Sequence, residues 1–258
     1  MRRYKCVFCR ASTDARGDLC PSCGEDGLIP ATGASRAKPE LATAITMRND
    51  ARAAAPQELE PLFPKGIPIP GVVILTGPPG VGKTTIACRW ATEIRGGKAL
   101  VASTEQTKAA VVDAAKRSGA DLRRLYVAEV ATLADLRAAC ASTKPTALVV
   151  DSIDELAEDD PELAPRDKPI RLVRNMIELA RELDAVLILV AQTNKSDDLA
   201  GPRRAEHLAD ATLHLDDTTI RAAKNRFGPR LSVPREAGAG DVKAVGRKAP
   251  APTAFDVS

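Results

Sequence analysis

Residues 77–84 have the sequence GPPGVGKT and match the phosphate-binding pattern G-x-x-x-x-G-K-[ST]. The glycines allow backbone N–H groups to turn inward around phosphate oxygens, and a helix that begins near Lys83 directs its positive end at them. We expect Lys83 to reach the β- and γ-phosphates of ATP and Thr84 to bind Mg²⁺. The predicted nucleotide-binding set is Gly77, Pro78, Pro79, Gly80, Val81, Gly82, Lys83, Thr84 and Thr85.

Three polar residues that follow apolar runs complete the predicted chemistry. Asp151 ends the run ALVVD and is the candidate second ligand of Mg²⁺. Glu105 follows ALVAS and is the candidate base that orients the attacking water, with Asp154 and Glu155 as alternatives. Gln192 follows AVLILVA and is a candidate sensor of the γ-phosphate. Structural roles remain open for each of them, as a helix cap, a turn former or a satisfied strand-end amide.

Four of the six cysteines form a C-x2-C-x10-C-x2-C pattern near the start of the sequence. Four thiolates with this spacing predict a closed, structural Zn²⁺ site that supplies folding energy to a small domain. A redox dithiol and an iron–sulfur centre are the alternatives. Cys88 and Cys140 lie in apolar helical patterns and are expected to be small buried hydrophobes. The predicted zinc ligands are Cys6, Cys9, Cys20 and Cys23.

A basic segment, RAAKNRFGPR, occupies residues 221–230. Five basic residues and no acidic residue lie between Arg221 and Arg235, although the net charge of the whole chain is only +3. Such local clustering predicts contact with negative charge on a nucleotide or a nucleic acid. A solvated basic hairpin, or a turn with Gly228 at positive φ, is the structural alternative.

Alternating apolar strands and amphipathic helices must position these residues. The expected strands are 72–76, 98–103, 124–128, 147–151 and 185–191, and the expected helices are 83–95, 107–117, 132–142 and 168–183. This alternation predicts an α/β fold with a mostly parallel sheet between helices, followed by three shorter strands near 211–216, 219–224 and 230–234. The predicted organisation is a zinc ribbon at 1–28, a linker at 29–55, an ATPase core at 56–235 and a disordered tail at 236–258.

The composition is that of a soluble globular protein, with 44% hydrophobic and 28% charged residues in 258. The basic start MRRYKC is followed by no apolar leader segment, and the apolar runs are far shorter than a membrane span. We therefore expect a cytoplasmic protein without membrane contact. Aromatic residues are only 3% of the chain, which argues against base stacking on aromatic platforms.

Four motifs in order, namely the cysteine finger, GPPGVGKTT, LAGPRRAEHLAD and KNRFG, resemble the RadA (Sms) family of bacterial DNA-repair proteins. The resemblance covers residues 6 to about 235 and implies a RecA-like P-loop ATPase that forms a hexameric ring on single-stranded or branched DNA. It further implies branch migration during recombination, DNA-stimulated ATP hydrolysis and a recombinase or helicase as partner. By this resemblance Lys224 and Arg226 reach the ATP of a neighbouring subunit or the DNA.

The segment 193–208 aligns with the second DNA-facing loop of the family, where Lys195, Arg203 and Arg204 are candidate phosphate contacts. His207 in this segment is expected to be structural. The sequence also departs from the family, because the Lon-protease-like C-terminal domain and the tryptophan after the fourth cysteine are absent. In addition, an acidic run at 158–160 occupies the place of the first DNA loop, where it would repel a phosphate backbone.

Three functions are consistent with these observations. The first is a DNA-dependent motor of the RadA and RecA class. The second is a RecA-like regulatory or assembly module that binds ATP without moving along DNA, which the acidic run and the short length favour. The third is a zinc-finger adaptor with an inactive ATP site, against which the complete set of Lys83, Thr84, Asp151 and Glu105 argues.

Overall fold

The computed structural model describes residues 4–6, 12–13, 21–22, 28–30, 51–94, 97–157, 168–191 and 207–235. The chain divides into two compact units, Met1–Arg48 and Asn49–Ser258. In the first unit, strand β1 pairs antiparallel with both β2 and β3. These strands are β1 (Tyr4–Cys6), β2 (Ser12–Thr13) and β3 (Leu28–Pro30).

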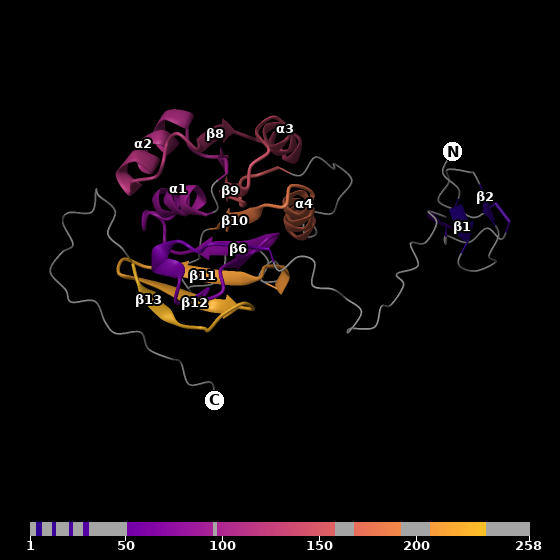
Figure 1. The fold of residues 1–258 in the computed structure, drawn as a ribbon. Coiled ribbons are helices and arrows are strands. Elements are labelled where there is room, and N and C mark those ends of the chain that lie inside the picture. The colour runs from indigo at the N-terminus through magenta and orange to yellow at the C-terminus, as the bar shows by residue number, and fades with distance from the viewer. Residues whose placement is uncertain are drawn as a thin grey trace. The chain divides into compact units, whose positions relative to one another are not determined.

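An eight-stranded sheet forms the centre of the second unit, in the order β13-β12-β11-β6-β10-β9-β7-β8 (Figure 1). The six strands from β11 to β8 are parallel, whereas β12 and β13 add antiparallel pairs at the β11 edge. The predicted mostly parallel sheet is therefore confirmed. The strands are β6 (Gly71–Thr76), β7 (Ala99–Ser103), β8 (Leu125–Glu129), β9 (Ala147–Asp151), β10 (Val186–Val190), β11 (Ala211–Leu215), β12 (Thr219–Asn225) and β13 (Ser232–Pro234).

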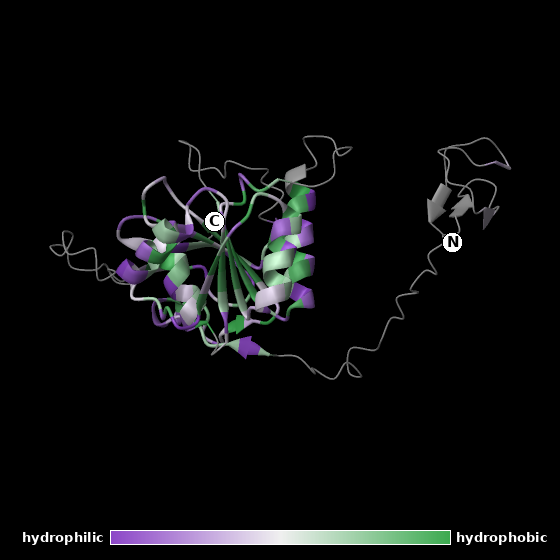
Figure 2. Ribbon diagram, turned by 90° about the horizontal axis from the view of Figure 1, so that it is seen from above, coloured by the Kyte–Doolittle hydropathy of each residue, from purple (hydrophilic) through white to green (hydrophobic). Residues whose placement is uncertain are grey.

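Helices cover both faces of this sheet, which explains why its central strands are apolar without alternation (Figure 2). Successive side chains of one strand enter different cores, because Val73 and Leu75 join the core beneath α1 and α2 while Val72 and Ile74 join the core beneath α3 and α4. The helices are α1 (Lys83–Glu93), α2 (Lys108–Ser118), α3 (Leu133–Thr143) and α4 (Lys168–Glu182).

The helix ends follow local sequence signals. Helix α2 begins after Thr107, whose hydroxyl accepts a hydrogen bond from the N–H of Ala110, and it ends at Gly119, which has φ of 78°. Helix α3 begins with a capping box between Thr132 and Asp135. None of the helices in the described segments is long and apolar enough to cross a membrane.

An entry segment, residues 51–70, packs on the core ahead of the first central strand. It contains β4 (Arg52–Ala53), a 3₁₀ turn η2 (Gln57–Leu59) and β5 (Ile67–Pro68), and β4 pairs antiparallel with β5. Leu62 and Phe63 are buried in the core beneath α1. The folded core thus begins before residue 56, within residues that the sequence pattern assigned to the linker.

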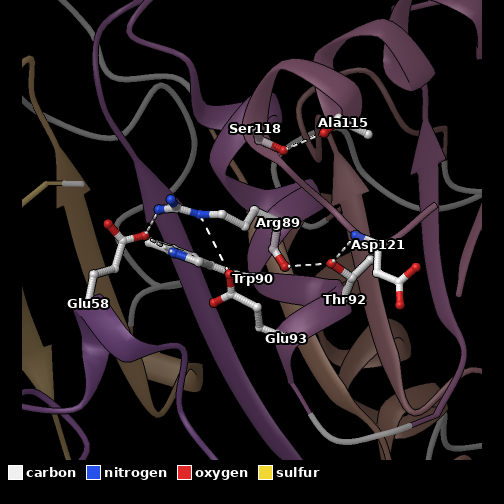
Figure 3. Close-up of polar contacts among 8 residues, drawn as sticks. All are labelled: Glu58, Arg89, Trp90, Thr92, Glu93, Ala115, Ser118 and Asp121. Atoms are coloured by element: carbon white, nitrogen blue, oxygen red, sulfur yellow. Dashed lines mark hydrogen bonds and ion pairs between the residues drawn. The ribbon is translucent and has the colours of Figure 1, made fainter. Parts of the chain in front are cut away.

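A buried polar cluster joins the entry segment to α1 (Figure 3). The carboxylate of Glu58 accepts hydrogen bonds from the guanidinium of Arg89 and from the indole N–H of Trp90. One turn further on, the Thr92 hydroxyl donates to the carbonyl of Arg89 (2.9 Å) and accepts from the N–H of Asp121 (3.2 Å), just after α2. The helix that follows the phosphate loop is therefore held at one side by η2 and at the other by the end of α2.

Candidate nucleotide-binding site

The phosphate loop connects the carboxyl end of β6 to the start of α1, as the motif requires. Gly77 has φ of 150°, and a Cβ atom there would lie 2.3 Å from the carbonyl oxygen of Leu215, so no larger residue fits. Lys83 is buried, and its Nζ donates to the carbonyl oxygens of Gly77 (2.8 Å) and Pro78 (2.9 Å). A lysine ammonium has three donors, so these two bonds hold it at the loop and leave one donor for a phosphate oxygen.

The two predicted ligands of Mg²⁺ lie together. The Thr84 hydroxyl donates to Oδ2 of Asp151 over 2.5 Å, and Asp151 is only 7% exposed at the carboxyl end of β9. A hydroxyl and a carboxylate are hard oxygen ligands of the kind that Mg²⁺ takes from proteins. Nε2 of Gln106 also donates to the Thr84 hydroxyl (3.1 Å), a contact that the sequence pattern did not indicate.

Burial perturbs the charged groups of the loop. Removal from water raises the pKa of Asp151, and the nearby Glu105 carboxylate adds to this increase, while the hydrogen bond from Thr84 opposes it. Removal from water also lowers the pKa of Lys83, against the attraction of Asp151. A cation bound beside Asp151 and an anion bound beside Lys83 would each oppose these pKa shifts, because each favours the charged form of its neighbour.

Glu105 lies where β7 ends, next to Asp151 in the sheet. Register places Ser103 opposite Asp151, and Oε1 of Glu105 accepts a hydrogen bond from the Ser152 hydroxyl over 2.6 Å. Thr104 fixes the same junction, because its hydroxyl accepts from the N–H of Ser152 (2.9 Å). The alternative bases Asp154 and Glu155 are exposed in the turn that follows. The hydrogen bond from Ser152 holds the Glu105 carboxylate at the cavity, and its role as the base stays a prediction. Ser152 is a residue that sequence reasoning missed.

A cavity of about 350 Å³ joins these groups. The loop supplies one wall, and the ends of β7 and β9 supply the other. A Cβ atom on Gly80 would meet nothing within 4 Å, so the loop faces open space there. The size, the positive helix end and the oxygen ligands fit a nucleoside triphosphate with Mg²⁺. The lining residues are Pro79, Gly80, Gly82, Lys83, Thr84, Thr85, Glu105, Gln106, Ala114, Arg117, Asp151, Ser152 and Val190.

Two cations at the site come from parts of the chain that the motif does not include. Arg117, in the last turn of α2, lines the cavity. Arg235, which follows β13, donates from Nη1 to the carbonyl oxygen of Val81 over 2.9 Å. The position of neither residue in the sequence predicts that it lies at the phosphate loop. Both reach the loop only because of the way the chain folds.

Lys224 and Arg226, the two basic residues of KNRFG, lie at the end of β12, beside the amino-terminal part of β11. Lys224 donates from Nζ to the carbonyl oxygens of His207 (3.1 Å) and Ala209 (2.6 Å). Arg226 donates to the same carbonyl of His207 (3.1 Å) and lies 3.5 Å from Asp210 in an ion pair. Both side chains therefore hold the residues that enter β11, and His207 takes part through its backbone.

Strand register places Lys224 away from the phosphate loop of its own chain. Lys224 pairs with Thr212, which pairs with Ile74, three residues before Gly77. That offset is roughly 10 Å along the strands and roughly 10 Å across two strand spacings. Within one chain the lysine and the loop thus lie in different regions of the sheet.

The other three residues of KNRFG attach the hairpin to the entry segment. Nδ2 of Asn225 donates to the carbonyl oxygen of Leu62 (2.7 Å), and Arg52 lies 5.7 Å from the centre of the Phe227 ring. A Cβ atom on Gly228 would lie 1.9 Å from that same Leu62 oxygen. Close approach of two backbones, and not a positive φ, therefore requires the glycine.

Several predicted residues lie outside the described segments. These include Gln192, the candidate DNA contacts Lys195, Arg203 and Arg204, the acidic run 158–160 and, apart from the backbone of Cys6, the four zinc ligands. Within the segments that are described, no group of three or more His, Cys, Asp or Glu residues is arranged to hold a metal ion. The zinc site remains a prediction.

Comparison with known proteins agrees with this fold. "DNA repair protein RadA" of Mycobacterium tuberculosis is 29% identical over 255 residues, which cover 88% of this chain and 52% of that protein. The protein of the same name from Brucella abortus is 27% identical over 262 residues, with 88% and 56% covered. The chain therefore spans about half the length of these curated relatives.

Solved structures show the same fold at low identity. A structure described as an "ATPase Domain" matches with a TM-score of 0.55 and 17% identity, covering 67% of this chain and 83% of that one. A DnaB-like replicative helicase, solved to examine its interactions with primase, matches with a TM-score of 0.52 and 18% identity, covering 64% and 54%. These likenesses confirm the predicted RecA-like arrangement of the core. A family model described as "AAA domain" matches residues 37–198, more than half of the sequence, and the chain therefore belongs to this family, AAA_25.

Proposed function

We propose that this protein is a Mg²⁺-dependent ATPase that acts on DNA during recombination and repair. The observation that carries the ATPase proposal is the contact between Thr84 and Asp151, with Lys83 and Glu105 at the same cavity. The set contains a phosphate cradle, two oxygen ligands for a metal ion and a carboxylate for a water molecule, which are the recurring parts of phosphoryl transfer.

The chain's own residues would perform hydrolysis as follows. The N–H groups at the start of α1 hold the phosphates together with the ammonium of Lys83, whose bonds to Gly77 and Pro78 leave one N–H donor for a phosphate oxygen. Thr84 and Asp151 would hold Mg²⁺, which supplies positive charge to the β- and γ-phosphates when bound. Glu105, directed by the hydroxyl of Ser152, would orient the attacking water.

DNA as partner is supported by the similarity to proteins named for DNA repair and by the basic KNRFG hairpin. We infer that subunits form a ring in which Lys224, helped by Arg226, serves the ATP of a neighbour. The register that separates Lys224 from its own phosphate loop favours such a role over one within the same chain. In this proposal the segment 193–208, through Lys195, Arg203 and Arg204, contacts the DNA backbone. The zinc ribbon at 1–28 binds Zn²⁺ through Cys6, Cys9, Cys20 and Cys23.

The test is steady-state ATP hydrolysis by the full chain, with and without single-stranded DNA, at low and moderate salt. We expect DNA to stimulate hydrolysis and salt to weaken this stimulation, because phosphate contacts release counterions. Lys83→Ala and Asp151→Asn should each lower activity by roughly two orders of magnitude. Hydrolysis that is indifferent to DNA would instead support the RecA-like regulatory module, which the acidic run at 158–160 favours.

A second comparison isolates the proposed finger. Lys224→Ala should keep ATP binding and lose DNA-stimulated hydrolysis, because cationic fingers in known NTPases contribute roughly 10³–10⁵ in rate. Lys65→Ala is the matched control, since Lys65 is an exposed lysine of the entry segment. Normal stimulated turnover in Lys224→Ala would exclude the finger role.

A further inference from the structure

Helix α2 contributes Arg117 to the wall of the nucleotide cavity. Ala114 and Arg117 both line the cavity, and a spacing of three residues places them on one face of the helix. Helical side chains lean toward the N-terminus of their helix, and α2 begins shortly after β7, at the edge of the sheet where Glu105 lies. Ala114 is buried and ends at its Cβ atom, so it leaves room for the longer Arg117 side chain to extend over it toward the cavity.

Arg117 differs from the other charged residues of the cavity lining in its bonding. Within the described segments, no hydrogen bond or ion pair joins its exposed side chain to another residue. The other three charged groups are each bonded to the protein, because Lys83 donates to two loop carbonyls, Asp151 accepts from Thr84 and Glu105 accepts from Ser152. A guanidinium has five N–H donors. Those of Arg117 are therefore available to a ligand in the cavity without the loss of a bond to a described residue.

The charges at the cavity favour a second cation when a nucleotide is bound. Asp151, Asp154 and Glu105 all act on the ammonium of Lys83, so carboxylates outnumber this cation. A nucleoside diphosphate or triphosphate brings several more negative charges, and the N-terminus of α1 and Lys83 offset only part of them. Besides Lys83, Arg117 is the one positively charged residue of the cavity lining. Its guanidinium is thus placed to offset the charge that the ligand adds.

We propose that Arg117 is a nucleotide-binding residue whose guanidinium pairs with the phosphate groups of a bound nucleoside diphosphate or triphosphate. This inference rests on the proposed function, since it adds a ligand contact to the same site. The planar guanidinium forms paired N–H···O bonds with phosphate oxygens. Mg²⁺ neutralises part of the phosphate charge, so Arg117 contributes more to affinity when the metal ion is absent.

The experiment is the measurement of ADP affinity for the full chain by calorimetry, in EDTA and in excess Mg²⁺. The proteins compared are the unsubstituted chain, Arg117→Ala, Arg117→Gln and Arg117→Lys. We expect Ala and Gln to bind ADP about tenfold more weakly in EDTA and about threefold more weakly in Mg²⁺, while Lys, which keeps the charge, stays within about threefold of the unsubstituted protein in EDTA. Inorganic pyrophosphate in EDTA should lose the same factor as ADP, because the contact is with phosphate.

Lys116→Ala is the matched control for loss of one positive charge in the last turn of α2. Lys116 has the same relation to the helix dipole as Arg117, but it lies 3.8 Å from Asp113 in an ion pair and outside the cavity lining. We expect its ADP affinity to stay within about twofold of the unsubstituted value. The ADP-induced shift in each variant's own unfolding midpoint gives a second value of affinity that is independent of any loss in stability.

Four results would overturn the inference. These are full ADP affinity in Arg117→Ala, an equal loss in Lys116→Ala, no recovery in Arg117→Lys, and a loss for ADP without a loss for pyrophosphate, which would place the contact at the nucleoside. Absence of ADP binding in the unsubstituted protein would instead overturn the proposed function itself.

Discussion

Removal of the Glu58 carboxylate should destabilise the core of the protein. In the structure this side chain is 2% exposed and its partner Arg89 is 11% exposed, and the same oxygen also accepts the N–H of Trp90. The substitution Glu58→Ala leaves a buried guanidinium without its nearest carboxylate and a buried indole N–H without its acceptor. Both groups lie on α1, the helix that begins in the phosphate loop.

The magnitude follows from the burial of the pair. Breaking a buried ion pair by removing one partner costs about 3–5 kcal/mol of unfolding free energy. Glu93 lies 3.9 Å from Nε of Arg89 and offsets part of the guanidinium charge after Glu58 is removed. We therefore expect Glu58→Ala to lower the unfolding free energy by about 3 kcal/mol. Glu58→Gln keeps an acceptor for the indole and should cost less. The double variant Glu58→Ala/Arg89→Ala should be more stable than the sum of its parts predicts, by about 2 kcal/mol.

Urea unfolding followed by tryptophan fluorescence measures these values, and Trp90 is the only tryptophan of the sequence. Glu60→Ala is the control, because Glu60 is exposed two residues further along and should change stability by less than about 0.5 kcal/mol. A loss below about 1 kcal/mol for Glu58→Ala, or strictly additive values for the double variant, would contradict the buried pair.

Three further expectations follow from other contacts. Gly228→Ala should lower the unfolding free energy by about 2 kcal/mol in urea titration, because its Cβ would meet the carbonyl of residue 62 at 1.9 Å; a change below about 0.5 kcal/mol would contradict this. Cys88 and Cys140 should resist alkylation at pH 8 in the native protein, since burial raises the pKa of each thiol to about 12. After treatment with a chelator, mass spectrometry should find all four amino-terminal cysteines alkylated. Alkylation of those four cysteines without a chelator would argue against zinc. Burial raises the pKa of Asp216, but hydrogen bonds from Thr219 and Thr218 outweigh it and lower the pKa below its usual 3.8. The stability that this carboxylate contributes is therefore present above pH 3.8 and is lost as the pH falls through the folded-state pKa. The unfolding free energies of Asp216→Asn and of the unsubstituted protein should become equal in that pH range, and a difference that does not change with pH would refute the expectation.

The sequence predicts the parallel sheet well because both of its signals are local. Apolar runs bounded by helical patterns identify each strand, and the phosphate-loop motif requires a strand before it and a helix after it. Carboxyl ends of parallel strands meet at one edge, which is sufficient to bring Asp151 to Thr84 and Glu105 to the same cavity. These positions follow from topology alone.

The contacts that the sequence does not predict join segments far apart in the chain. Arg235 and Val81 are separated by 154 positions, and Asn225 and Leu62 by 163. Each depends on the path of the antiparallel hairpin and the entry segment after both have packed, and no periodicity encodes that path. For the same reason the pattern KNRFG indicates only basic residues and a turn glycine, while in the structure Gly228 is needed for the close approach to a carbonyl.

The bond between Asn225 and Leu62 joins the first and the last segments of the folded core. Ends of a domain usually fray independently, and their amide protons then exchange at unrelated rates. Here neither end can detach without breaking the same hydrogen bond and losing the contact between Arg52 and Phe227. We therefore expect the entry segment and the hairpin to open together, with amide protons that exchange at similar rates in both.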